Sequence, residues 1–128
     1  MNGWIPVDKT NLKTQYPDVY AIGDVNGVGT PKAGVFAEGA AEVAAASIIA
    51  DFEGSEQPSP YKGNGTCYVE FGNGMVGKVN IDFFSGPSPS GRYTEASVDL
   101  VDDKQYFGSS REAPWFGSET ISVAELTK

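Results

Sequence analysis

A short apolar segment that ends on a glycine and an aspartate is the feature that most constrains this chain. Residues Val19 to Ile22 have the length and composition of a β-strand, and Gly23 and Asp24 follow directly. Glycine has no side chain, so it lets a ligand or another backbone approach closely. A carboxylate at the carboxyl end of a strand faces the crevice in which α/β sheets bind ligands. We therefore expect Asp24 to accept hydrogen bonds from the hydroxyl groups of a sugar-alcohol chain.

One long helix is predicted from Pro31 to Phe52. The segment is rich in alanine, the strongest helix former, and Thr30 and Pro31 suit the cap and first turn of a helix. Gly54 is expected to end the helix, because glycine readily adopts the left-handed conformation found there. Six larger apolar residues are expected to form the packing stripe: Val35, Phe36, Val43, Ile48, Ile49 and Phe52.

A β-hairpin is predicted after the polar linker Ser55 to Pro60. Thr66 to Phe71 alternates between apolar and polar residues, Gly72-Asn73-Gly74 is a turn signal, and Met75 to Phe84 continues as the second strand. The two strands are therefore expected to pair side by side.

A C-terminal helix is predicted over Thr94 to Phe107, after the turn-rich connector Gly86 to Gly91. Thr94 can cap this helix, and Leu100 and Phe107 fall on one side, where they are expected to dock on the hairpin. The predicted fold class is therefore α+β, with a short strand and a long helix followed by a β-hairpin and a C-terminal helix.

These segments together resemble the FAD-dependent pyridine nucleotide-disulfide oxidoreductases. The second FAD motif of that superfamily is a threonine followed, several residues later, by V-[FY]-A-x-G-D, which matches Thr14 and then Val19 to Asp24. The flanking segments Gly3 to Asp8 and Pro31 to Glu38 resemble the branch that contains sulfide:quinone oxidoreductase and the flavocytochrome c sulfide dehydrogenase flavoprotein. The resemblance covers nearly the whole chain and weakens only at the extreme C-terminus.

The resemblance implies that the chain is part of a two-Rossmann-domain flavoprotein. Residues 1–54 would be the C-terminal part of the FAD-binding domain, and residues 55–128 a hairpin and helix interface region packed as one unit with it. The family's G-x-G-x-x-G fingerprint has no match, because Gly23 to Gly29 is glycine-rich but has the wrong spacing. We therefore expect a C-terminal fragment, inactive by itself, whose partner is the missing N-terminal FAD- and NAD-binding part of the same protein.

FAD is the cofactor that the resemblance implies, bound by the full-length protein and not by the fragment alone. Gly23 and Asp24 would contact its ribityl chain, and in the family the next helix runs beneath the isoalloxazine ring. Reduced flavin carries negative charge near N1 and the C2 oxygen, which free N–H groups at a helix N-terminus stabilise. The expected donors are the backbone N–H groups around Ala33, Gly34 and Val35, with Lys32 adding a positive charge. The alternative is a helix that is merely buried.

Cys67, the single cysteine, is the candidate for covalent redox chemistry. Gly65 to Tyr68 resembles the segment that carries the second redox cysteine of the sulfide-oxidising enzymes. In those enzymes two cysteines beside the flavin form a disulfide or hold sulfur atoms between them, and a cysteine reacts as its thiolate. The alternative is a buried, inert cysteine at the start of a strand. Cys67 is therefore a conditional catalytic residue.

The function that the resemblance implies is electron transfer from sulfide or NAD(P)H through FAD to a quinone or cytochrome acceptor. Two alternatives stay open: an NADH:acceptor oxidoreductase in which Cys67 is inert, and a non-catalytic interaction or dimerisation module that forms a homo-oligomer. C-terminal aromatic residues help form the quinone pocket of sulfide:quinone oxidoreductases, although aromatic residues are also typical of packing. The candidates are Phe83, Phe84, Trp115 and Phe116.

Composition argues against several other classes. With no histidine and one cysteine in 128 residues, neither a zinc site, nor a histidine-based triad, nor an internal disulfide framework is expected. A net charge of -8 argues against a nucleic-acid partner. No apolar run approaches the roughly 20 residues that span a bilayer. The compartment of the parent stays open between the cytoplasm, the periplasm and peripheral attachment to a membrane.

Overall fold

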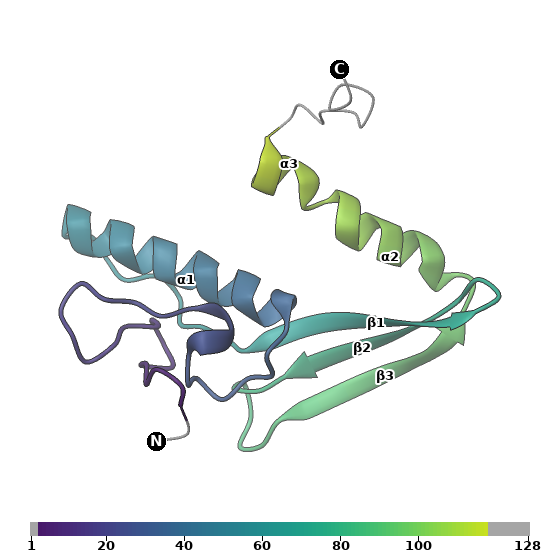
Figure 1. Cartoon of the computed structure of the whole chain (residues 1–128), viewed down its shortest axis with the longest axis horizontal. Helices are drawn as coiled ribbons and strands as arrows, with labels where there is room; N and C mark the ends of the chain where they lie inside the picture. The colour runs from purple at the N-terminus through teal and green to yellow at the C-terminus, as the bar shows by residue number, and fades with distance from the viewer. Residues whose placement is uncertain (1–2, 118–128) are drawn as a thin grey trace. The chain divides into compact units, whose positions relative to one another are not determined.

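The computed structural model describes residues 3–117 and has a mixed α+β structure (Figure 1). Its strands form one antiparallel sheet in the order β1-β2-β3. The elements in chain order are the 3-10 helix η1 (Gly23–Val25), α1 (Gly34–Glu53), β1 (Asn64–Gly72), β2 (Met75–Asp82), β3 (Ser90–Ser97), α2 (Leu100–Ser109) and α3 (Glu112–Phe116). Among the described residues, no helix is long and apolar enough to cross a membrane.

The chain divides into two compact units. Unit 1 comprises Met1–Cys67 and Val79–Arg92, and unit 2 comprises Tyr68–Lys78 and Tyr93–Lys128. The predicted division into residues 1–54 and 55–128 differs from these two units, and it stays a prediction.

The core of unit 1 is built on one side of α1. Leu12 and Val28, from the segment before the helix, pack with Ala40 and Ala44 of the helix and with Tyr61. The packing stripe predicted for this helix is confirmed at Phe36 and Val43 and is wrong in its C-terminal half. Ile48, Ile49 and Phe52 are exposed, and the residues buried on α1 are Phe36, Ala40, Ala44, Ser47 and Ala50. The small side chains of Ala40 and Ala44 let the N-terminal segment lie close to the helix backbone, and Ile48, Ile49 and Phe52 lie outside this contact.

The sequence predicts the C-terminal end of α1 correctly and its N-terminal end incorrectly. The C-terminal end is confirmed: Gly54 has a φ of 64° in the left-handed region, and Ser55 N–H donates to the Ala50 oxygen at 2.9 Å. The N-terminal end is wrong by three residues. The helix begins at Gly34, and Ala33 precedes it in an extended conformation without a side-chain cap, so Thr30 is not the cap.

The strand predicted over Val19 to Ile22 is also wrong. The segment makes one isolated antiparallel bridge, between Lys13 and Tyr20. A strand needs a continuous hydrogen-bonded ladder to a neighbour, and the described residues supply only this single bridge. Val19 and Ile22 consequently remain 47% and 41% exposed.

The hairpin prediction is confirmed by β1 and β2. Their two-residue connection is Asn73-Gly74, with φ values of 50° and 72°. Positive φ at both positions is the requirement of the type I′ turn, whose twist matches that of the paired strands.

The predicted C-terminal helix begins later than expected. Thr94 to Ser97 belong to β3, and α2 begins at Leu100, so Thr94 is not a helix cap. Pairing with β2 gives these residues a hydrogen-bonded ladder, and this tertiary pairing overrides their local preference for a helix.

Helix α2 is held on the hairpin within unit 2. The expected docking of Phe107 is confirmed, since its ring lies 5.3 Å from that of Tyr68 of β1 in an edge-to-face arrangement. Asp103 adds polar contacts, accepting from the Tyr68 hydroxyl at 2.8 Å and pairing with Lys78 Nζ at 2.5 Å. Lys104 also pairs with Glu70. Helix α2 therefore covers the face of the hairpin that carries Tyr68 and Lys78.

Candidate functional site

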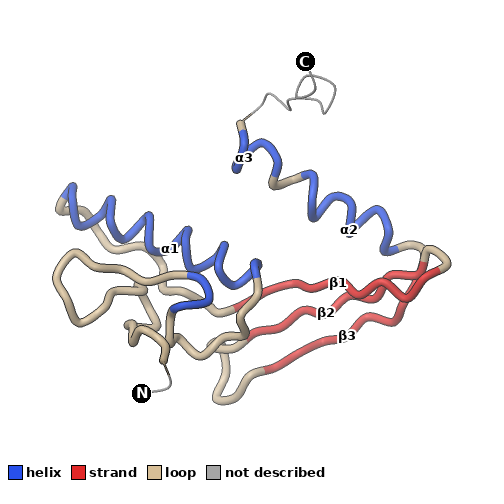
Figure 2. Tube along the Cα trace, in the orientation of Figure 1, coloured by secondary structure: helices blue, strands red, loops and turns tan. Residues whose placement is uncertain are grey.

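The Gly23-Asp24 pair lies beside the beginning of α1. These residues form η1, which packs against α1 in unit 1 (Figure 2). Gly23 has a φ of 70°, and a Cβ built on it would lie 4.0 Å from Ala37 Cβ in the first turns of the helix. The next residue, Asp24, is exposed. The structure thus brings the predicted glycine and carboxylate together with the predicted helix start.

The N-terminus of α1 carries no side-chain cap. The N–H groups of Phe36 and Ala37 donate to the Ala33 oxygen at 3.0 and 3.2 Å, and the Ala33 N–H donates to Pro31. That leaves Gly34 and Val35 as the candidate backbone donors among the three predicted. The first turn has no acidic residue. Because free N–H groups at a helix N-terminus carry partial positive charge, this end suits an anionic or electron-rich ligand atom.

Lys32 braces the loop that leads into α1. Its Nζ donates to the carbonyl oxygen of Asn26 and lies 4.5 Å from the centre of the Trp4 ring. Asn26 is buried, and its side-chain oxygen accepts from the Val28 N–H at 3.1 Å. The ammonium predicted to face the ligand is therefore engaged inside the loop, where it fixes the path from η1 to the helix.

Strand β1 carries Cys67 on the side where α1 begins. A Cβ built on Gly65 would lie 2.9 Å from Val35 Cγ1 and 3.1 Å from Phe36 Cε1, so this side of the strand faces the first helical turn. Residues two apart on a strand face the same side, about 7 Å apart along it. Cys67 is a half-buried free thiol on this same side. The predicted site residues of η1, α1 and β1 are thus gathered in one unit.

The predicted acceptor-pocket aromatics belong to different units. Phe83 and Phe84 lie in unit 1, and the exposed residues Trp115 and Phe116 lie in unit 2. Within residues 3–117, no group of three or more acidic or cysteine side chains is placed to hold a metal ion.

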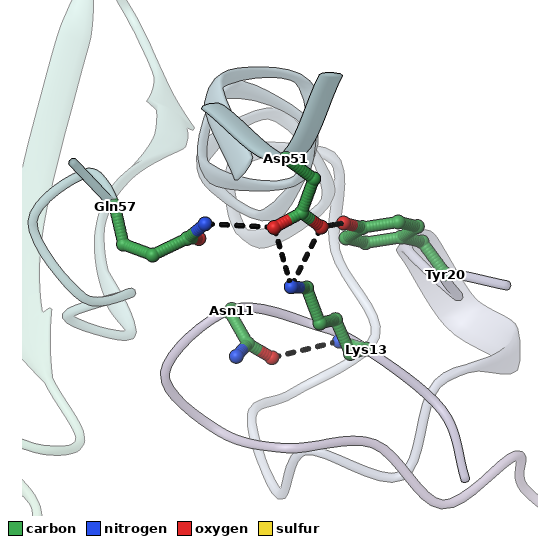
Figure 3. A network of polar contacts seen from close by, with 5 residues as sticks. All are labelled: Asn11, Lys13, Tyr20, Asp51 and Gln57. Carbon is green, nitrogen blue, oxygen red and sulfur yellow. Dashed lines mark hydrogen bonds and ion pairs between the residues drawn. The ribbon is translucent and has the colours of Figure 1, made fainter. Parts of the chain in front are cut away.

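A polar cluster near the C-terminal end of α1 was missed by sequence reasoning (Figure 3). The Asp51 carboxylate accepts from Tyr20 Oη at 2.5 Å and from Gln57 Nε2 at 2.8 Å, and it pairs with Lys13 Nζ at 2.6 Å. Asn11 Oδ1 accepts from the backbone N–H of Lys13 at 3.0 Å. These contacts hold the loop from Lys13 to Tyr20 on the helix. Lys13 and Asp51 are 38 residues apart, so no local sequence pattern indicates that they pair.

Acidification is expected to release this loop. The hydrogen bond from Lys13 lowers the pKa of Asp51 below its ordinary value of 3.8. A carboxylate with a lowered folded-state pKa contributes stability that is complete above its unfolded pKa and is lost as pH falls through the folded value. The ring resonances of Tyr20, followed by NMR, should therefore move as pH falls below about 4. In Asp51→Asn the loop should already be released at neutral pH; a similar acid transition in that variant would contradict the assignment.

No protein-family model and no curated protein matches the chain. The family assignment therefore stays a prediction, based on the motif resemblance.

Proposed function

We propose that the chain is the C-terminal portion of an FAD-dependent oxidoreductase that resembles sulfide:quinone oxidoreductase and flavocytochrome c sulfide dehydrogenase. The observation that carries the proposal is the gathering, in unit 1, of the Gly23-Asp24 turn, the uncapped start of α1 and the side of β1 that carries Cys67. Cys67 lies far along the sequence from the other two features, and the meeting of all three at one helix end is what a flavin site of this kind requires.

Each residue of this site has a separate task in the proposal. Asp24 accepts hydrogen bonds from the ribityl hydroxyls, and Gly23, without a side chain, leaves room for the ligand. The N–H groups of Gly34 and Val35 stabilise negative charge at the pyrimidine edge of the ring. FAD, when bound, would supply two-electron redox chemistry between sulfide or NAD(P)H and a quinone or cytochrome acceptor. Lys32 acts indirectly, by holding the loop that aims the helix start.

The exposed apolar residues of unit 1 support the proposal that a further segment of the protein packs against this unit. Helix α1 also carries large apolar residues outside the core, where Phe52 is 92% exposed and Ile48 and Ile49 are exposed as well. Exposed apolar residues that gather on one element mark an interaction surface. We propose that the N-terminal FAD- and NAD-binding part of the same protein packs over these exposed residues of α1. Its strands would also extend the ladder begun at Tyr20.

Replacing Cys67 with serine separates the two enzymatic alternatives. The variant is made in the full-length protein, meaning the protein expressed from its longest natural reading frame, and flavin reduction is followed anaerobically. If Cys67 is the second redox cysteine, sulfide reduces the flavin of the wild type but not of Cys67→Ser, because serine cannot form a bond to sulfur that is later broken reductively. FAD content should be the same in both proteins.

The NADH:acceptor alternative predicts the opposite pattern. NADH then reduces the flavin of both proteins equally, and sulfide reduces neither. Sulfide-dependent reduction that is retained in Cys67→Ser would remove Cys67 from the site.

A further inference from the structure

Unit 1 contains an aromatic pocket that shares no lining residue with the proposed flavin site. Its volume is about 660 Å³, which lies in the range of small-molecule sites, roughly 300–1,000 Å³. Its walls come from the N-terminal segment, the residues before β1 and the residues after β2. The lining residues include Lys9, Tyr61, Phe83, Phe84, Pro87 and Pro89.

The aromatic wall of this pocket is fixed in place. Tyr61 is 6% exposed, its hydroxyl donates to the Phe36 oxygen at 3.1 Å, and its ring lies 6.0 Å from that of Phe84, edge to face. Phe84 in turn lies on Gly63, where an added Cβ would come within 2.6 Å of Phe84 Cδ2. The Asp82 carboxylate accepts from the Phe84 N–H at 3.1 Å. A wall held by these contacts is preformed, so ligand binding loses little free energy to the ordering of side chains.

A single lysine gives the pocket a positive charge. Lys9 Nζ lies 5.3 Å from the centre of the Phe84 ring. The lysines that form ion pairs within residues 3–117 are Lys13, Lys78 and Lys104, so Lys9 has no carboxylate partner there. The whole chain carries a net charge of -8, whereas Lys9 places a positive charge beside the aromatic wall. This charge favours an anionic ligand group at the edge of the wall.

We propose that this pocket binds a planar aromatic anion. The ligand ring packs against the wall of Tyr61, Phe83 and Phe84, and its anionic group pairs with Lys9. Aromatic rings favour edge-to-face and offset contacts with one another, and the rigid rings of Pro87 and Pro89 complete a slot for a flat molecule. The proposal does not depend on flavin binding.

The test is calorimetric titration of the full-length protein with 2-naphthoate, its neutral amide 2-naphthamide and the non-aromatic anion cyclohexanecarboxylate. We expect 2-naphthoate to bind in the sub-millimolar to millimolar range and each of the other two to bind at least about threefold more weakly. Lys9→Gln should weaken 2-naphthoate binding about threefold to fivefold and leave 2-naphthamide unchanged.

Lys62→Gln is the matched control, since Lys62 is an exposed lysine of the same unit that does not line the pocket. It removes the same charge and should leave 2-naphthoate affinity unchanged. Phe84→Leu should weaken 2-naphthoate binding by about fivefold; if that variant does not fold, Lys9→Gln and the ligand series still decide. No binding of 2-naphthoate at millimolar concentration, equal affinity for the amide, or equal effects of the two lysine variants would overturn the proposal. Flavin content is measured in each protein, so the failure of one proposal is distinguishable from the failure of the other.

Discussion

Asp24→Ala in the full-length protein is expected to lower FAD affinity by at least about tenfold. A hydrogen bond to a charged group contributes about 1.5–3 kcal/mol, and about 1.4 kcal/mol corresponds to a factor of ten in affinity. Asp24 is exposed in η1 beside the start of α1 and packs in no core. Its loss should therefore act on the ligand and leave folding unchanged. The measurement is the visible flavin absorbance per protein, followed by titration of FAD into the apoprotein.

Glu42→Ala is the control for Asp24→Ala. Glu42 is exposed on α1, so its replacement removes the same charge at a position outside the proposed site. It should leave FAD affinity unchanged. Asp24→Asn, which keeps one acceptor oxygen but not the charge, should fall between the wild type and Asp24→Ala. Equal FAD content in Asp24→Ala and Glu42→Ala would remove Asp24 from the binding site.

Gly65→Ala is expected to destabilise the chain by about 1–3 kcal/mol, the usual cost of an extra carbon in a packed position. Its Cβ would lie 2.9 Å from Val35 Cγ1 and 3.1 Å from Phe36 Cε1. Phe36 is 3% exposed, so the first turn of α1 has little freedom to move away. The free energy of unfolding in urea measures the effect.

Two further variants show whether the close contact with α1 is the cause. Gly91→Ala adds the same methyl group to β3 at a position where the nearest atom is 3.8 Å away, and it should change stability by no more than about 0.5 kcal/mol. Val35→Ala combined with Gly65→Ala should recover part of the loss, because the first change makes room for the second. If Gly65→Ala and Gly91→Ala have the same free energy of unfolding, β1 does not pack tightly against the first turn of α1. In the full-length protein, Gly65→Ala should also weaken FAD binding.

The parts of the fold that local chemistry determines are the parts that the sequence predicts well. The Asn73-Gly74 turn, the Gly54 helix end and the alanine-rich body of α1 each depend on neighbouring residues, and all three are present. Elements that depend on distant partners are predicted poorly. Thr94 to Ser97 suits a helix in isolation, and its pairing with β2 makes it a strand. The segment Val19 to Ile22 has a strand's composition but only one bridge.

The candidate site shows the same limit. Sequence reasoning finds Gly23, Asp24 and the helix start because they lie close together in a motif. It does not find that Lys32 is engaged by Asn26 and Trp4, because a cation–π contact has no sequence signature. The choice of packing side on α1 is likewise decided by Leu12 and Val28, which lie outside the helix. Side-chain direction and long-range contacts therefore need the structure.

If this chain supplies part of a flavin site, a visible absorption spectrum shows it most directly. The full-length protein is purified, its spectrum is recorded anaerobically, and sulfide or NADH is then added. We expect a bound-flavin band that one of these donors bleaches. Bleaching by sulfide makes Cys67 part of the site, and bleaching by NADH alone makes it structural. A full-length protein that is folded but shows no flavin band, even after incubation with FAD, would contradict the account.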